Sequence, residues 1–254
     1  MTLFQQFPRL GQLATPATVA GIALMPILAY TVKSYRKWHA LGRGGLPHNI
    51  FGFAIQSVLQ LLAKRDTIDD APFSAPATVA RYKPHGEETF LHAPLLARTG
   101  SRPTVPGFAA PQRQITEQAT AAIKDKMTRY LDAVAAANPN ALVCELSRLE
   151  GGNGPGIYLA DKAHAPAFMS DLKGEVVHHH LEGSSHMVLS LADAREAVSK
   201  GWAQRFPLAG VRAIPWTYVL VYAPRDEGEL AVWKGLVVAA LRFVTAGGPS
   251  INEV

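Results

Sequence analysis

The sequence is almost free of cysteine, because Cys144 is the only one among its 254 residues. An internal disulfide and a zinc site built from several thiolates are therefore excluded, and a reducing compartment is indicated. Cys144 lies in an alternating stretch beside apolar neighbours. We expect it to be buried in a strand and chemically inert.

Charge is also scarce and scattered. Only 18% of the residues are charged, and although the net charge is +5, the lysines and arginines form no block that could follow a phosphate backbone. We therefore expect no nucleic-acid partner. Gly151–Gly156 lacks the lysine and the following helix of a phosphate-binding loop, and Ser147, Ser184 and Ser185 lack the context of a nucleophile elbow. Nucleotide-dependent and serine-hydrolase chemistry is not expected.

The N-terminal segment contains a long run without charge, Leu10–Val32. This run is long enough to span a bilayer with some tilt. Arg9 alone precedes it, whereas residues 33–37 contain three basic side chains, which favours a cytosolic position for the rest of the chain. We expect residues 1–38 to be a transmembrane anchor with a basic flank. The expected location is the endoplasmic reticulum membrane, with the catalytic domain facing the cytosol. A cleaved signal peptide and a buried core helix remain alternatives.

Residues 39–254 predict a single α+β domain. Helical patterns and stop signals are followed by short alternating stretches and a final helix, which favours an antiparallel sheet packed with helices behind the N-terminal membrane-anchor helix. The predicted helices cover Asn49 to about Lys64, the segment after Pro111 through about Ala137, Ala192–Lys200, and Asp226 to about Ala246. The predicted strands are Leu142–Arg148, Ile157–Ala160, Val176–His180, His186–Leu191 and Thr217–Tyr222.

Four of the nine histidines lie between residues 178 and 186. Side chains two apart on a strand share a face, so His178 and His180 point the same way and His179 points the opposite way. A turn at Leu181–Ser185 brings His186 back beside them on the next strand. Three interpretations follow from this spacing: a metal site with Glu182 as a fourth group, a proton-transfer site, and a purely structural cluster.

A second candidate segment follows the helix at Ala192–Lys200. Gly201 is expected to end that helix in a left-handed conformation. After it, Trp202 and Phe206 can form an aromatic wall, while Gln204 and Arg205 can bind polar oxygens of a ligand. The alternative is that Trp202 only fills the core.

The last predicted strand ends in a further pair of candidates, Tyr222 and Arg225. Both could face the same site as the histidines. The alternative places Tyr222 in the core and makes Arg225 a surface partner of Asp226 or Glu229.

Two long motifs, Lys200–Gly210 and Trp216–Asp226, resemble the luciferases of luminescent fungi and their luciferase-domain relatives. The histidine block at 178–186 resembles the same family, as do the shorter motifs Ser101–Thr104 and Gln112–Gln114. The N-terminal apolar run, its Gly/Pro linker and the short apolar helix after it also match, so the resemblance covers nearly the whole chain.

The resemblance implies a membrane-anchored oxygenase without cofactor or metal, with O2 as co-substrate. Such an enzyme oxidises the pyranone 3-hydroxyhispidin to caffeylpyruvate, CO2 and light. His178, His180 and His186 then supply the base and stabilise the peroxide. Six further residues are expected to bind the pyranone: Trp202, Gln204, Arg205, Phe206, Tyr222 and Arg225. This chain departs from the family pattern in two ways. The luciferases look as if they carry His at the position of Phe206, and the turn between His180 and His186 looks shorter here than in them.

Overall fold

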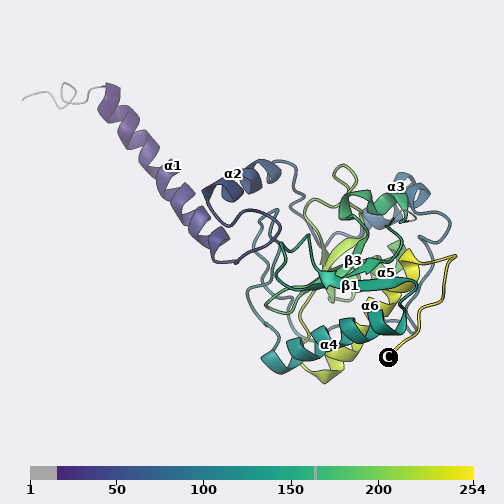
Figure 1. Ribbon diagram of the computed structural model, residues 1–254. Coiled ribbons are helices and arrows are strands. Elements are labelled where there is room, and N and C mark those ends of the chain that lie inside the picture. The colour runs from purple at the N-terminus through teal and green to yellow at the C-terminus, as the bar shows by residue number, and fades with distance from the viewer. Residues whose placement is uncertain (1–15, 163–164) are drawn as a thin grey trace, which may run out of the picture. The chain divides into compact units, whose positions relative to one another are not determined.

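The structure describes residues 16–162 and 165–254. An antiparallel sheet of six strands forms the centre of the unit that begins at Leu41 (Figure 1). The structure is a computed structural model. The strands lie in the order β1-β2-β3-β4-β6-β5, and every neighbouring pair is antiparallel. The α+β class and the antiparallel sheet predicted from the sequence are thus confirmed. The strands are β1 (Leu142–Leu146), β2 (Pro155–Leu159), β3 (Glu175–His179), β4 (Ser185–Val188), β5 (Ala203–Arg205) and β6 (Tyr218–Val221).

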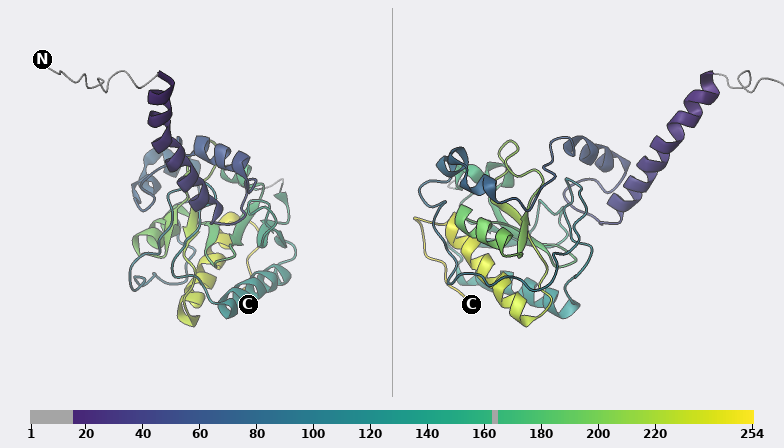
Figure 2. Two further views of the ribbon diagram at one scale, coloured as in Figure 1. Left: turned by 90° about the vertical axis from the view of Figure 1, so that its left-hand side faces the viewer. Right: turned by 180° about the vertical axis from the view of Figure 1, so that it is seen from behind.

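The two longest helices of the domain pack side by side on one face of this sheet (Figure 1 and Figure 2). They are α4 (Ala121–Ala137) and α6 (Glu227–Val244). Each begins at a side-chain cap: the Thr120 hydroxyl accepts from the Ile123 amide, and the Asp226 carboxylate accepts from the Glu229 amide. Such caps satisfy backbone donors that the first helical turn leaves free.

Helix α4 is shorter than the sequence pattern indicates. The prediction began it just after Pro111, but it starts at Ala121 because Thr120 caps it and the preceding residues form irregular backbone. The apolar stripe predicted for its later turns is confirmed, since Ile123, Met127 and Leu131 are buried. Residues 110–112, which lie before the helix, instead line a pocket on the opposite face of the sheet.

The remaining helices of this unit are short. The predicted cap Asn49 is confirmed, because its side chain accepts from the amides of Phe51 and Gly52 at the start of α2. Gly201 ends α5 with a φ of +84°, as expected for a left-handed cap. These elements are α2 (Ile50–Leu59), η2 (Ala71–Ser74), α3 (Pro76–Arg81), η4 (Ala167–Leu172) and α5 (Leu191–Ser199).

Two details of the sheet depart from the prediction. Strand β5 was not predicted, because its three residues are too few to show an alternating pattern. Cys144 on β1 is only partly buried, and desolvation followed by the nearby Asp132 carboxylate raises the pKa of its thiol to about 12. The thiol therefore stays protonated at neutral pH, in keeping with the predicted lack of reactivity.

The N-terminal segment belongs to a separate compact unit, Met1–Ala40, while residues Leu41–Val254 form the other. Its helix is α1 (Pro16–His39), and residues 10–15 of the predicted membrane run lie outside the described part of the chain. No helix within the described residues is both long and apolar enough to cross a bilayer. The predicted transmembrane anchor is therefore not supported: α1 contains Pro26 and carries basic residues through its last turns.

Candidate active site

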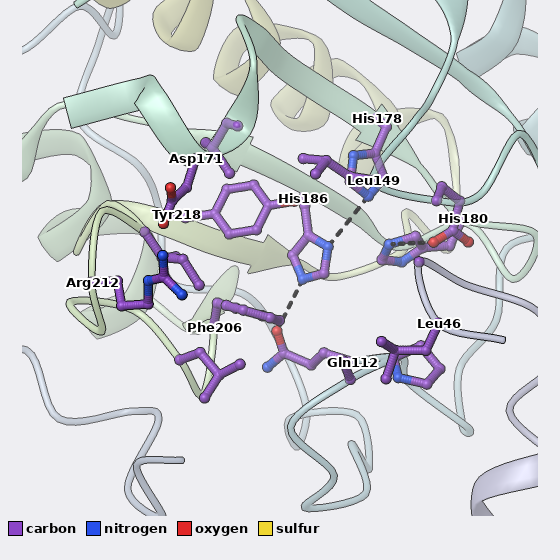
Figure 3. A pocket seen from close by; sticks show the side chains of 17 residues that line it. Leu46, Gln112, Leu149, Asp171, His178, His180, His186, Phe206, Arg212 and Tyr218 are labelled. Atoms are coloured by element: carbon purple, nitrogen blue, oxygen red, sulfur yellow. Dashed lines mark hydrogen bonds and ion pairs between the residues drawn. The ribbon is translucent and has the colours of Figure 1, made fainter. Parts of the chain in front are cut away.

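Three histidines meet on the face of the sheet that α4 and α6 leave uncovered (Figure 3). His178 on β3 and His186 on β4 are direct partners across the two strands, and His186 Nδ1 lies 3.4 Å from His178 Nε2. His180, two residues beyond His178, joins them on the same face. The three ring centroids are 4.8 to 5.3 Å apart, and all three rings are buried. The predicted convergence is thus observed.

His179 points to the other face, as the strand period requires. Its Nε2 lies 2.9 Å from the Thr128 hydroxyl on α4, and its backbone partner across the strands is Ser185. The indole of Trp233 on α6 donates to the Ser185 hydroxyl on the same side. His179 is therefore a buried neighbour of the cluster with a structural partner of its own.

A β-bulge adds a carboxylate to the histidine face. Val177 pairs with Ile157 and Glu175 with Tyr158, so Val176 is an extra residue on β3. One extra residue reverses the alternation, which puts Glu175 on the side of His178 although the two are three apart. Glu175 Oε1 accepts from His178 Nδ1 at 2.6 Å.

Glu175 also accepts from the Ser147 hydroxyl at 2.5 Å and the Tyr158 hydroxyl at 2.6 Å. Burial alone raises the pKa of Glu175, but the hydrogen bonds and charge of His178 and the two hydroxyls outweigh it, so the net shift is downward. An ionised Glu175 can only accept, so His178 carries a proton on Nδ1, and in the neutral ring Nε2 is then the lone pair.

The other two rings are fixed in the same way. The Gln112 side chain donates an amide N–H to the Arg205 carbonyl, so its Oε1 faces His186 and accepts from His186 Nε2 at 3.0 Å. The Ser184 hydroxyl donates to Glu182 at 2.6 Å, so its oxygen accepts from His180 Nδ1 at 2.8 Å. In the neutral rings the lone pairs are then His186 Nδ1 and His180 Nε2.

Two more buried carboxylates and one guanidinium surround the cluster. Arg113 forms ion pairs with Glu150 and Glu182, and Glu150 Oε2 lies 3.9 Å from His180 Nε2. Burial raises the pKa of both carboxyl groups, while Arg113 opposes the rise. The Arg113 guanidinium thus lowers the free-energy cost of burying two carboxylates beside the histidines.

The pKa values of His180 and His186 lie well below 6.5. Burial is the main cause for both, and repulsion from Arg113 and from the protonated forms of the neighbouring histidines adds to it. Both rings are therefore neutral near pH 7. Neutral imidazoles with free lone pairs can accept a proton from a weakly acidic substrate or bind a metal ion.

The cluster forms part of the floor of a pocket of about 450 Å³ (Figure 3). Phe206 and Tyr218 flank His186: Phe206 meets its ring edge-on at 5.3 Å and Tyr218 stacks on it at 4.8 Å. Asp171 and Arg212 also line the pocket. Leu172 of η4 adds to the wall, and the rest comes largely from irregular segments, with Gly45, Leu46, Ala110, Pro111, Leu149, Leu208 and Ile214 among the lining residues.

Of the six residues predicted to bind substrate, Phe206 lines this pocket and the other five do not. Trp202 packs in the core and donates its indole N–H to the Leu96 carbonyl. Gln204 on β5 donates to Thr67 and accepts from the Tyr222 hydroxyl, so these two predicted residues contact each other instead.

The two predicted arginines also bind other parts of the protein. Arg205 donates to the carbonyls of Asp66 and Asp69, and Arg225 pairs with Glu229 and donates to Thr99. The alternatives placing Trp202 and Tyr222 in the core, with Arg225 as a partner of Glu229, agree with these contacts. A role of the five residues in substrate binding stays a prediction.

Several residues around the histidines were not predicted as site residues. Glu175 was missed because regular alternation places it on the opposite face, and only the bulge at Val176 reverses this. Gln112 and Glu150 lie in irregular segments, which carry no periodic signal. Glu182 was noted as a possible fourth metal-binding group; its Oε1 accepts from the Ser184 hydroxyl and lies 3.4 Å from His180 Nδ1, the outer nitrogen of that ring.

Comparison with known proteins matches residues 173–240 to the luciferase domain family. A luciferase of Armillaria mellea is 28% identical over 90% of this chain and 87% of its own length. A luciferase of Neonothopanus nambi is 26% identical over 96% of this chain and 94% of its own. No solved structure matches significantly. Residues 173–240, which contain all three clustered histidines, thus match the luciferase domain family, and the chain is similar to the fungal luciferases over nearly its whole length, as its motifs predicted.

Proposed function

We propose that this protein is an oxygenase of the fungal luciferase type that oxidises a 3-hydroxy-pyranone with O2. The substrate proposed is 3-hydroxyhispidin, and the products are caffeylpyruvate, CO2 and light. One observation carries the proposal: three buried imidazoles converge at the floor of a largely apolar pocket, within the domain that relates the chain to proteins named luciferase.

The chemistry begins with removal of the enol proton. A 3-hydroxy-pyranone becomes electron-rich enough to react with O2 only as its anion. In the metal-free protein an imidazole of the cluster accepts this proton, since His180 and His186 are neutral near pH 7. O2 adds to the ring, the O–O bond later breaks, and CO2 leaves, so both oxygen atoms remain in the organic product and the CO2.

The lining of the pocket suits a flat aromatic substrate. Phe206 and Tyr218 offer aromatic surfaces beside His186, where a pyranone ring can lie. In Figure 3, Asp171 and Arg212 lie on the side of Tyr218 away from His180, where they can bind polar groups at the far end of the molecule. Apolar walls keep water from the reactive intermediate.

We propose O2 as the co-substrate and no organic cofactor. The sequence has no dinucleotide fingerprint and no phosphate-binding loop, and an enolate supplies its own electrons to O2. The proposed ligand of the protein is thus the aromatic pyranone itself, together with O2.

The test is to mix the purified protein with 3-hydroxyhispidin in air and to record O2 uptake, CO2 release and light. Hispidin is the matched control, because it lacks the 3-hydroxyl group whose anion is proposed to react with O2. We expect O2 uptake and CO2 release with the first compound only. Binding of the pyranone without O2 uptake would replace the enzyme by a non-catalytic binding protein.

Variants of the histidines test the site. His180→Ala and His186→Ala should each lower turnover about 10²–10⁴-fold, the usual contribution of a positioned base, with a smaller effect on substrate binding. His179→Ala is the matched control, because that ring contacts Thr128 on the other face of the sheet. Equal, small losses in all three variants would contradict the assignment.

A further inference from the structure

The hydrogen bonds around the three histidines point all three lone pairs at one another. Glu175, Ser184 and Gln112 each accept from the outer nitrogen of one ring. The inner nitrogens are then His178 Nε2, His180 Nε2 and His186 Nδ1, and in the neutral rings none of them carries a proton. We propose that His178, His180 and His186 form a binding site for a divalent transition-metal ion. This inference stands on the geometry alone and does not depend on the proposed substrate.

The outer partners are of the kind that orient metal-binding histidines. A metal-ligating imidazole usually donates its second N–H to a carboxylate or another fixed acceptor, which sets the tautomer and the ring direction. Here the three acceptors are themselves fixed: Glu175 by Ser147 and Tyr158, Ser184 by Glu182, and Gln112 by the Arg205 carbonyl. A cluster with only a packing role needs no such second layer.

The contact between His178 Nε2 and His186 Nδ1 contains no donor when both rings are neutral. Two neutral acceptor nitrogens 3.4 Å apart repel each other. An added proton would relieve this one contact and leave the lone pair of His180 without a donor. A metal ion placed among the rings satisfies all three nitrogens at once.

The buried charges agree with a divalent ion. Glu150, Glu175 and Glu182 lie around the rings, and Arg113 pairs with two of them. When all three carboxylates are ionised, one guanidinium leaves two negative charges uncompensated in a buried site, and a divalent cation restores neutrality.

The distances allow coordination after a small adjustment. One nitrogen from each ring lies within 4.8 Å of the others. Two ligands bound at ~2.1 Å to one ion lie at most ~4.2 Å apart, so at least one ring has to move slightly inward. Glu150 Oε2, 3.9 Å from His180 Nε2, is placed to be a fourth ligand.

The donor set indicates which ions fit. Imidazole nitrogens favour zinc, iron, cobalt or copper over magnesium and calcium, which prefer oxygen. Three histidines on one side leave the pocket side open for a further ligand. A cation at that position would also acidify an enol placed against it, and so would act in the same direction as the imidazole base.

The experiment uses protein without a histidine tag, because a tag binds the same ions. The full chain is treated with chelator, dialysed, and titrated with Co²⁺ alone and then with Zn²⁺. We expect visible absorption bands that saturate at about one Co²⁺ per chain and are displaced by Zn²⁺, together with a rise in the melting temperature on Zn²⁺ addition. Absence of both signals in the wild-type protein overturns the proposal.

Variants locate the ion. His178→Ala, His180→Ala and His186→Ala should each lose the cobalt bands and the Zn²⁺-dependent thermal shift. His179→Ala should keep both, because that ring lies on the opposite face. Equal Co²⁺ binding in His180→Ala and His179→Ala would overturn the site. Where a variant fails to fold, the wild-type titration still decides whether an ion binds.

The outcome is independent of the proposed reaction. If the protein binds about one metal ion per chain but takes up no O2 with any hydroxy-pyranone, the proposed function is wrong and the metal site stands. If the chelator-treated protein binds no Co²⁺ but still takes up O2 at the full rate, the metal site is wrong and the proposed function stands.

Discussion

Glu175→Gln should destabilise the metal-free protein strongly although it changes few atoms. Glu175 is 1% exposed and accepts from four donors with two oxygens. Ser147 and His178 donate to Oε1, while Tyr158 and the Leu149 amide donate to Oε2. A glutamine has one oxygen for two of these donors, and its NH2 group faces the other two.

The magnitude follows from how many donors can find a new partner. With the amide oxygen in the place of Oε1, the Tyr158 hydroxyl can turn to the Leu146 carbonyl, 3.3 Å away, and the Leu149 amide is left without an acceptor. One unsatisfied buried donor costs about 1–3 kcal/mol, and two hydrogen bonds lose their charge assistance. We expect a total loss of about 3–5 kcal/mol.

Urea denaturation at neutral pH with chelator present measures this loss. Glu145→Gln is the matched control, since the Glu145 side chain is 42% exposed and its ion pairs are worth well below ~1 kcal/mol. Tyr158→Phe, which removes one donor and keeps the carboxylate, should cost about 1–2 kcal/mol. A loss below ~1 kcal/mol in Glu175→Gln would refute the view that an ionised carboxylate fixes the His178 tautomer.

Three further predictions concern the scaffold. Burial raises the pKa of Glu229, but hydrogen bonds from Arg225 and Arg98 outweigh it, so the pKa in the folded protein is lowered. The ionised Glu229 should therefore contribute its full stability to the fold above pH ~4.5, and this contribution should be lost as the pH falls through the pKa of the folded state. Urea titrations of wild type and Glu229→Gln should therefore converge in acid, and a gap that is constant with pH would contradict this. Asn49→Ala should cost about 1 kcal/mol by removing the cap of α2, measured by the same method, and no loss would show that the cap is not formed. Gly210→Ala should cost about 2–4 kcal/mol, since φ there is +78° and a Cβ would lie 2.2 Å from the Trp216 indole; an unchanged melting temperature would contradict this.

The convergence of the histidines was predictable because it depends on the strand period alone. His178 and His180 share a face by their spacing, and the tight turn at 181–184 returns His186 to the position opposite His178. The same rule failed for Glu175, because a bulge changes the face without leaving a mark in the local pattern. The core helices were predictable for a similar reason, apart from the start of α4, which the Thr120 cap decides.

The polar residues near Trp202 show where sequence reasoning ends. Gln204 and Arg205 have the chemistry to bind a substrate, but their partners are Thr67, Asp66 and Asp69, more than a hundred residues away in the chain. The path of an irregular segment depends on tertiary contacts, and no period in the sequence reports it. Residues in such segments can be identified as capable of binding, whereas what they bind requires the fold.

The site divides its work between two kinds of structure. The histidines lie on β3 and β4 and in the tight turn between them, in the middle of the sheet, where neighbouring strands and buried partners fix each ring. Much of the pocket wall, including Leu46, Pro111 and the 206–214 segment, comes from irregular segments that can change without disturbing the sheet.

Substitutions in these two parts should consequently differ in their kinetic effect. Phe206→Leu keeps an apolar wall but removes the ring that meets His186 edge-on, so it should raise KM for the pyranone more than it lowers kcat. His186→Ala should do the opposite, because the enol must lose its proton before O2 can add. Steady-state kinetics on both variants separates the two roles. A fall of kcat in Phe206→Leu as large as in His186→Ala would mean that the wall takes part in the chemical step, and that the division between a reactive sheet and a selective wall is wrong.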